Sequence, residues 1–115
     1  HLEVARFLLK NGADAKLATK DGCTPLYRAC QNGRLVVVRL LLENDVDVNK
    51  ADDKHGTSPL FFAADQGRVD IARVLLERGA AVDQAAHNGA WPLYLACQLG
   101  RVDVVRLLLE HGADV

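Results

Sequence analysis

The chain has no methionine, few aromatic residues and almost no excess of either charge. Its 14 basic and 15 acidic residues leave a formal net charge of −1, so it lacks the strongly basic surface typical of nucleic-acid binding. No apolar run approaches the roughly 18 residues of a membrane-spanning helix. Half of its 115 residues are hydrophobic and a quarter are charged, which is typical of a folded globular domain. We therefore expect no nucleic acid among its partners and no membrane insertion.

Cysteine is also scarce, and the three that are present, Cys23, Cys30 and Cys97, show no C-x-x-C spacing. An odd number without that spacing argues against a disulfide framework and against a zinc site. The four histidines stand in no spacing with Ser, Cys or Asp that predicts a catalytic triad. We therefore expect a non-enzymatic intracellular protein, cytoplasmic or nuclear, with reduced thiols and with no cofactor or metal.

What the chain does have is an internal repeat of 33 or 34 residues. Pro25, Pro59 and Pro92 are separated by 34 and 33 residues, and three glycines repeat these intervals eight residues further on. Residues 59–82 match residues 92–115 at 14 of 24 positions. Self-similarity at a fixed period of this length is typical of stacked repeat proteins.

Each repeat has the pattern of two short helices and a connecting loop. In "TPLYRACQNG", Thr24 suits the N-cap, Pro25 suits the first helical position, and Gly33 suits the helix end. In "RLVVVRLLLEN", the apolar residues follow one face of a second helix. The segment rich in Asp, Lys and Gly that follows predicts an extended turn or hairpin. The predicted helix pairs are 25–32 with 35–44, 59–66 with 69–78, and 92–99 with 102–111, preceded by a lone helix at 2–10.

The first helices begin with "TPLYRA", "SPLFFA" and "WPLYLA", which resemble the T-P-L-H-x-A motif of the ankyrin repeat. The resemblance covers the whole chain and implies an all-α solenoid of stacked helix-loop-helix units joined by β-hairpin-like loops. It predicts one domain over residues 1–115, with the second half of a repeat at 1–17 and repeats at 18–50, 51–84 and 85–115. The first helix has no partner helix, and the last helix keeps the full apolar pattern of an internal repeat, so we expect a segment of a longer array.

Two of the departures from the family pattern concern the contacts between adjacent units. Tyr27, Phe61 and Tyr94 stand where the motif has histidine, which in the family ties adjacent repeats through hydrogen bonds. We expect apolar burial of the aromatic rings to replace that polar tie. One extra residue lies ahead of Pro59, so the hairpin around residues 52–55 is predicted to differ in shape from its neighbours.

The resemblance implies a protein-interaction module that binds a partner protein or peptide on a concave surface of hairpin tips and first helices. Arg28, Phe62 and Leu95 share one repeat position on this surface. They would suit a partner with a hydrophobic segment and a nearby acidic residue. The predicted contact residues are Lys20, Asp21, Cys23, Arg28, Gln31 and Asn32 in the first complete unit, Lys54, His55, Thr57, Phe62, Asp65 and Gln66 in the second, and His87, Asn88, Trp91, Leu95, Gln98 and Leu99 in the third.

Several other residues have both a functional and a structural interpretation. The resemblance makes Asn49 a candidate for asparaginyl hydroxylation, whereas an asparagine at this position can also bond its own turn. Cys30 and Cys97 occupy the small-residue position of the first helix, which predicts that both are buried and inert. Cys23 precedes the helix N-cap and is expected to be exposed.

An arginine and a glutamate four residues apart recur on the predicted second helices. This spacing predicts a self-compensating ladder of surface ion pairs and makes a basic stripe for an anionic partner the less favoured interpretation. The three pairs are Arg39 with Glu43, Arg73 with Glu77, and Arg106 with Glu110.

Trp91, the single tryptophan, stands where Thr or Ser caps the other two first helices. The third unit thereby gives up a side-chain cap worth roughly 1 kcal/mol. Two interpretations are open. Either the indole folds over the adjoining hairpin against His87, or it lies partly exposed beside Leu95 and Leu99 as an aromatic anchor for a partner.

Two other functions are compatible with the sequence. The array could be a structural spacer or targeting element within a larger enzyme, channel or ubiquitin-ligase subunit, or an engineered binder derived from a natural array. The chain is expected to be monomeric, with end-to-end packing of uncapped repeats as the alternative.

Overall fold

The computed structural model describes residues 22–44 and 46–114. Within these residues, helices alternate with loops along the whole chain. The helix predicted at 2–10 and the partial repeat predicted at 1–17 lie outside the described residues. The described helices are α2 (Pro25–Gln31), α3 (Leu35–Leu42), α4 (Pro59–Gln66), α5 (Val69–Glu77), α6 (Pro92–Gln98) and α7 (Val102–Glu110).

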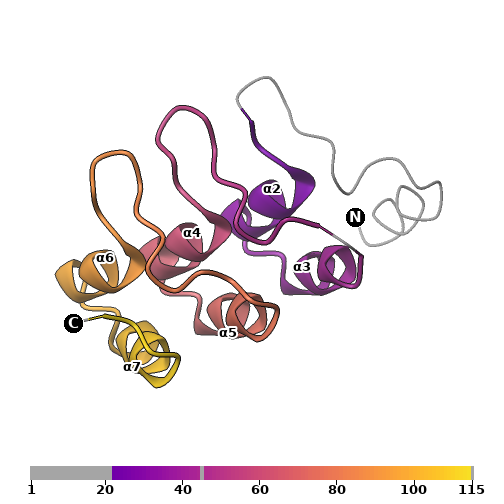
Figure 1. The fold of residues 1–115 in the computed structure, drawn as a ribbon. Coiled ribbons are helices and arrows are strands. Elements are labelled where there is room, and N and C mark those ends of the chain that lie inside the picture. Colours follow the sequence, from indigo (N-terminus) through magenta and orange to yellow (C-terminus); the bar gives the residue numbers. More distant parts are fainter. Residues whose placement is uncertain (1–21, 45, 115) are drawn as a thin grey trace.

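The helices form two rows (Figure 1). The first helices α2, α4 and α6 lie side by side in one row, and the second helices α3, α5 and α7 lie in the other. The loops that lead into α4 and α6 project from the same side of the array. We call these loops the arms; they comprise residues 51–58 before α4 and residues 85–91 before α6. No β-strand is formed in the part of the chain that the structure describes. The prediction of an all-α solenoid of stacked helix-loop-helix units is confirmed.

The first helices begin at their prolines because the residue before each proline has extended backbone. The Thr24 hydroxyl accepts a hydrogen bond from the Tyr27 N–H at 3.2 Å, and the Ser58 hydroxyl caps α4 through the Phe61 N–H at the same distance. Trp91 is extended as well, but its side chain caps nothing. The short turn that follows each first helix has a glycine in the left-handed conformation, with φ between 68° and 70°.

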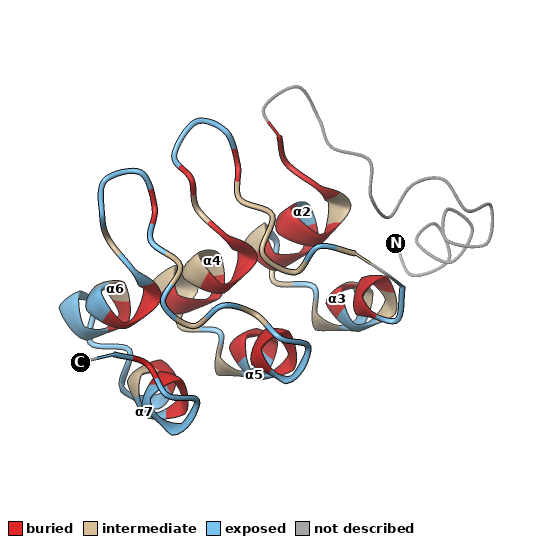
Figure 2. Ribbon diagram, in the orientation of Figure 1, coloured by how far each residue is buried: buried red, intermediate tan, exposed pale blue. Residues whose placement is uncertain are grey.

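The core lies between the two rows and continues from one unit to the next (Figure 2). Each first helix buries a leucine at its second position, and each second helix buries an apolar stripe against it. These helices have only seven to nine residues, too few to be stable in isolation. The largest fully buried side chains on the second helices are Val38, Ile71, Leu75, Val104, Leu107 and Leu108.

All six helices predicted within the described residues are confirmed, with ends that differ by at most two residues. The main difference is that α3 ends at Leu42, where the pattern predicted residue 44. The Glu43 N–H still bonds the carbonyls of the last turn, so the chain leaves the helix gradually.

The predicted ladder of surface ion pairs is wrong. None of the three arginine–glutamate pairs on α3, α5 and α7 forms an ion pair in the described structure. All of these side chains are exposed, and an arginine placed before a glutamate is the less favourable order relative to the helix dipole. Exposure to solvent weakens the attraction between the two charges, so closing each pair would contribute little stability.

The cysteines follow the prediction at only one of three positions. Cys30 is fully buried, and burial raises the pKa of its thiol to about 12. Cys97 is exposed, although its repeat position is that of Cys30, because no described unit packs on that side of α6. Cys23 is buried, contrary to the prediction, because the segment leading into α2 turns inward together with Thr24.

Leu75→Ala is expected to lower the free energy of unfolding by about 2–5 kcal/mol, because Leu75 is fully buried in the middle unit. Urea denaturation followed by circular dichroism measures this loss. Leu109→Ala is the matched control, and it should cost clearly less because Leu109 is 45% exposed. A loss below about 1 kcal/mol for Leu75→Ala would contradict its place in the core.

Candidate protein-binding surface

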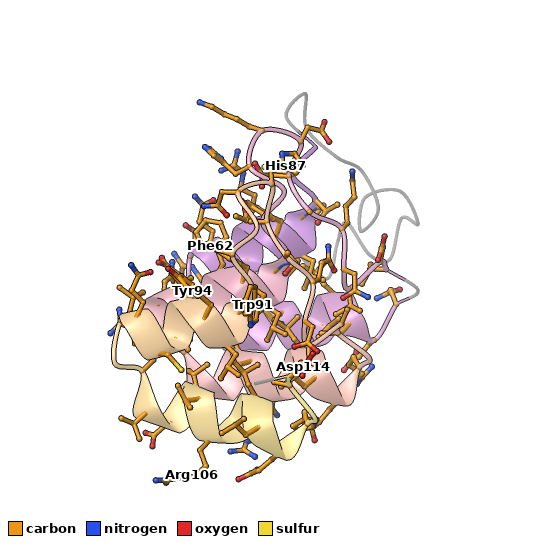
Figure 3. The ribbon with its side chains drawn as sticks, turned by 60° about the vertical axis from the view of Figure 1, so that its left-hand side comes forward. Phe62, His87, Trp91, Tyr94, Arg106 and Asp114 are labelled. Atoms are coloured by element: carbon orange, nitrogen blue, oxygen red, sulfur yellow. The ribbon has the colours of Figure 1, made fainter. Side chains whose placement is uncertain are left out.

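The candidate binding surface lies where the two arms meet the row of first helices at an angle. Phe62 lies in this angle, and His87 lies on one of the arms (Figure 3). Lys20 and Asp21 fall outside the described residues, and Cys23 is buried. Among the other predicted contact residues, the exposed ones are Arg28, Asn32, Lys54, His55, His87, Asn88, Trp91, Gln98 and Leu99. The half-buried ones are Gln31, Thr57, Phe62, Asp65, Gln66 and Leu95.

The arm before α4 is organised by one carboxylate. Asp52 is buried and accepts hydrogen bonds from the His55 N–H at 3.0 Å, the Thr57 N–H at 2.8 Å and the Thr57 hydroxyl at 2.5 Å. The extra residue lies in this arm, since four residues separate Asp52 from Thr57, whereas three separate the bonded pair Ala86 and Ala90 in the next arm. The predicted difference in shape is confirmed.

The surroundings of Asp52 favour its charged form. Burial by itself would raise the pKa of this carboxyl, but hydrogen bonds from the Thr57 hydroxyl and from the N–H groups of His55 and Thr57 outweigh burial. The nearby His55 ring acts in the same direction, with its Nδ1 3.5 Å from an Asp52 oxygen. The pKa of Asp52 therefore lies well below its ordinary value, and the arm is built around a carboxyl group whose charged form is favoured.

Tyr27 retains a polar tie between units, which corrects the expectation of purely apolar burial. Its hydroxyl lies 2.8 Å from the Thr57 hydroxyl of the next unit. Because Thr57 donates its proton to Asp52, Tyr27 is the donor in this contact. Burial raises the pKa of Tyr27 and keeps that proton in place. The Tyr27 and Phe62 rings also pack in a T-shaped arrangement, with ring centroids 5.1 Å apart.

The next interface has a different chemistry at the same positions. Phe61 replaces Tyr27, Ala90 replaces Thr57, and Ala86 replaces Asp52 as the residue that closes the arm. The arms are joined instead by the His87 N–H, which donates to the carbonyl of His55 at 2.8 Å.

Close packing of the arms also explains Gly56. The His87 ring would lie 2.3 Å from a Cβ placed at Gly56, whose φ of 68° already favours glycine. His87 therefore packs on the preceding arm.

Some predicted contact residues are already engaged in ties between units. The Gln66 side chain donates to the carbonyl of Gln31 at 2.8 Å and accepts from Arg68. Arg101 donates twice to the carbonyl of Asp65, at 3.0 and 3.2 Å. These bonds hold successive first helices in register, so the polar side chains beside them are part of the scaffold.

The Asn49 side chain bonds the next unit, whereas its backbone N–H donates to the Asp47 carboxylate in its own turn at 2.9 Å. Its side-chain oxygen accepts from the Ala81 N–H at 2.7 Å, and its carbonyl accepts from Gln84 at 2.9 Å. Asp83 repeats the first contact one unit later through the Asp114 N–H. The interpretation that the Asn49 side chain bonds its own turn is therefore wrong, because its oxygen is held by the next unit, and its hydroxylation stays a prediction.

Trp91 lies at the C-terminal end of the array. It is 37% exposed, and its ring packs at a tilt against Tyr94, with centroids 5.7 Å apart. Figure 3 shows both rings on the end of the array with Asp114. The Trp91 ring does not pack against His87, because the His87 ring lies over Gly56 on the preceding arm. Partial exposure is confirmed, with Tyr94 as its neighbour.

Two residues that hydrogen-bond neighbouring backbone, Asp52 and Gln84, were not predicted as functional residues. The signal for Asp52 is its spacing of five residues from Thr57 around the extra loop residue.

No group of three or more His, Cys, Asp or Glu residues in the described ranges could hold a metal ion. Within those same ranges, no helix is both long and apolar enough to cross a membrane.

The fold and these ties define a helical repeat protein whose units are joined by hydrogen bonds and a shared core. The sequence model of the protein family described as ankyrin repeats (3 copies) matches residues 1–86 and 50–115. The chain therefore belongs to the ankyrin-repeat family. Ankyrin repeats are protein-protein interaction modules with a non-catalytic fold.

Three curated relatives share part of this chain. A putative ankyrin repeat protein of Fowlpox virus is 43% identical over 49 residues, which are 43% of this chain and 19% of that protein. An ankyrin repeat and LEM domain-containing protein 1 homolog of Caenorhabditis elegans is 52% identical over 51 residues, 44% of this chain and 7% of that protein. The poly [ADP-ribose] polymerase tankyrase of the same organism is 43% identical over 47 residues, which are 41% of this chain and 2% of that protein. The matched stretches span less than a fifth of each relative.

Asp52→Asn is expected to lower the free energy of unfolding by about 1–3 kcal/mol at neutral pH, because an amide nitrogen cannot accept the bonds that the carboxylate accepts. The pKa of Asp52 in the folded state is lower than its ordinary value. Its charge therefore stabilises the folded protein at pH values above that ordinary pKa, and this stabilisation is lost as the pH falls. The difference between parent and variant should therefore shrink below about pH 4. Urea titrations at several pH values measure it.

Asp53→Asn, one residue away and exposed, is the matched control and should change stability by less than about 0.5 kcal/mol at every pH. A pH-independent difference for Asp52→Asn would contradict the role of its charge.

Trp91→Thr is expected to leave the free energy of unfolding within about 1 kcal/mol of the parent. The threonine regains an N-cap, which offsets the lost ring contact with Tyr94. Urea denaturation followed by circular dichroism tests this. A loss above about 2 kcal/mol would show that the indole belongs to the core.

Proposed function

We propose that this chain binds a partner protein or peptide, without catalysis, in the angle between the arms and the first helices. The observation that carries the proposal is the row formed by Arg28, Phe62 and Leu95, at the same position of α2, α4 and α6. Phe62 and Leu95 are apolar and only half-buried, although the core beneath them is complete.

Phe62 is held in place before any partner arrives. Its ring meets Tyr27 edge-on, and Tyr27 is fixed in turn by the Thr57 hydroxyl. A preorganised aromatic side chain loses little conformational entropy on binding, which favours it as an anchor. Arg28, one unit away, is exposed and bonds the Gln31 side chain at 2.8 Å. The row therefore suits an apolar segment with an acidic residue placed above Arg28.

The arms supply the second wall of this surface. Lys54, His55, His87 and Asn88 are exposed near the arm ends, while Asp52 and the bond between His87 and His55 fix the arm backbones. Variable polar side chains on a rigid support favour specific recognition of a partner.

A second candidate function is a spacer or targeting array inside a longer protein. The curated relatives favour it, because they are much longer than the matched stretch and include a polymerase and a LEM domain-containing protein by name. A spacer would not need the row of Arg28, Phe62 and Leu95 to bind a partner. Measuring whether this row binds a peptide therefore separates the two functions.

The test is selection of peptides from a displayed library of random 16-residue sequences against the purified chain. Enriched peptides should combine an apolar segment with an acidic residue. Phe62→Ser should weaken their binding about thirtyfold, equivalent to about 2 kcal/mol for a central anchor. Fluorescence anisotropy measures the dissociation constants.

Val36→Ser is the matched control, since Val36 is exposed on α3 in the other helix row. It should leave the dissociation constants unchanged. Arg28→Glu should weaken only the peptides that carry the acidic residue. Equal binding by the parent and by Phe62→Ser would contradict the proposed surface and favour the spacer.

A further inference from the structure

The row formed by Arg28, Phe62 and Leu95 changes from charged to apolar along the array. The position four residues later changes in the same direction, from Asn32 in the first described unit to Leu99 in the third. Arg28 and Asn32 are exposed although α4 packs beside α2, so exposure at these two positions does not depend on whether another unit follows. A bound segment therefore fits best with an acidic residue over the first unit and apolar residues over the other two.

The distance between units limits which conformations of a bound segment can follow this row. The first helices lie side by side (Figure 1), and packed helices have axes about 8–10 Å apart. Equivalent side chains of the row therefore recur at about this interval. A segment that contacts all three of them has to present the same face again after each such step.

A β-strand does not meet this requirement. Its side chains alternate between two faces, so one face returns after about 6.6 Å or about 13 Å and never after 8–10 Å. The part of the chain that the structure describes also contains no β-strand whose edge could pair with an added one. Strand addition is therefore the least favourable mode of binding for this row.

An α-helix does meet it. After seven residues and a rise of about 10.5 Å, a helix returns to nearly the same face. Residues i, i+7 and i+14 of a partner helix can then lie over Arg28, Phe62 and Leu95. Residue i+11 belongs to the same stripe and covers the space between the last two contacts.

A polyproline II segment is the rival conformation, because it also repeats its face, after three residues and about 9.3 Å. It makes no internal hydrogen bonds, so its amides would lose water over Phe62 and Leu95 and find no partner in these apolar side chains. A helix has already satisfied its backbone groups before it meets the same surface. The backbone energetics therefore favour the helix.

We propose that the partner segment is an amphipathic α-helix of about 15 residues that lies along the row, with an acidic residue over Arg28 and apolar residues seven and fourteen positions away over Phe62 and Leu95. The helix fills the angle in which Phe62 lies (Figure 3), with its polar side toward the arms. This inference rests on the proposed function and specifies the conformation and the residue spacing of the partner.

The probes are three synthetic 18-residue peptides, each made in both chain directions. The heptad peptide has glutamate at position i and leucine at i+7, i+11 and i+14 in a background of alanine, glutamine and lysine. The shuffled peptide has the same composition, with its leucines distributed over different helix faces. The proline peptide has glutamate and two leucines at intervals of three residues in a proline-rich background. By fluorescence anisotropy, the heptad peptide should bind the purified chain at least tenfold more tightly than the other two.

The bound conformation is tested by two changes on the side of the heptad peptide that faces away from its leucines. A hydrocarbon staple there should tighten binding about fivefold, because the helix is then formed in advance. A proline in the centre of that side should weaken binding at least tenfold, because it breaks the helix. The same staple in the shuffled peptide is the matched control and should change little.

The register is tested by pairing changes in the protein with changes in the peptide. Leu95→Ser should be coupled at least threefold to replacement of the leucine at i+14 by alanine, and it should be additive with the same replacement at i+7. Arg28→Glu should weaken the heptad peptide, and lysine in place of its glutamate should restore binding. Arg28 is exposed, so this exchange of charge tests the register even if Leu95→Ser unfolds the chain.

The outcomes separate this inference from the function on which it rests. Equal binding of the heptad and shuffled peptides, tighter binding of the proline peptide, or a staple that weakens binding would overturn the helix. Library peptides that bind through Phe62 would in that case still support the proposed surface. If neither the library nor the probes bound in a way that Phe62→Ser weakens, the proposed function itself would be contradicted.

Discussion

Stacking of one helix pair on the next is the contact on which the rest of this structure depends. Helices of seven to nine residues are not stable alone in water, so each unit owes its helical state to the apolar surface that its neighbour covers. Leu26, Leu60 and Leu93 occupy one repeat position and are all buried, so a single core runs through the array. The position of every other side chain follows from this stack.

Polar ties are then added to the common core, and they differ from one interface to the next. The first interface uses Tyr27, Thr57 and Asp52, while the second uses the bond between the His87 N–H and the His55 carbonyl. Each buried donor needs an acceptor, and the Tyr27 hydroxyl has its acceptor on the adjoining unit, so residues far apart in the sequence are chemically linked. This arrangement fixes the arms through contacts that do not involve Arg28 or Leu95 of the row beneath them.

The sequence alone was sufficient for the fold because the repeat places local signals at fixed intervals. Thr24 and Ser58 with the prolines that follow them marked the helix starts, and apolar spacing marked the second helices. The extra residue in the arm before α4 was also visible as a change of period. These features depend on neighbouring residues, whose interactions can be inferred from a linear pattern.

The partners of individual side chains were decided only by the tertiary structure. Cys30 and Cys97 have the same local sequence position, yet one is buried and the other exposed, because burial depends on what packs against the unit. Tyr27 was expected to lose a polar tie, but its hydroxyl reaches Thr57, thirty residues away. Sequence determined which residues face a neighbour, while the three-dimensional stack decided which atoms meet, since the contact distance depends on both units at once.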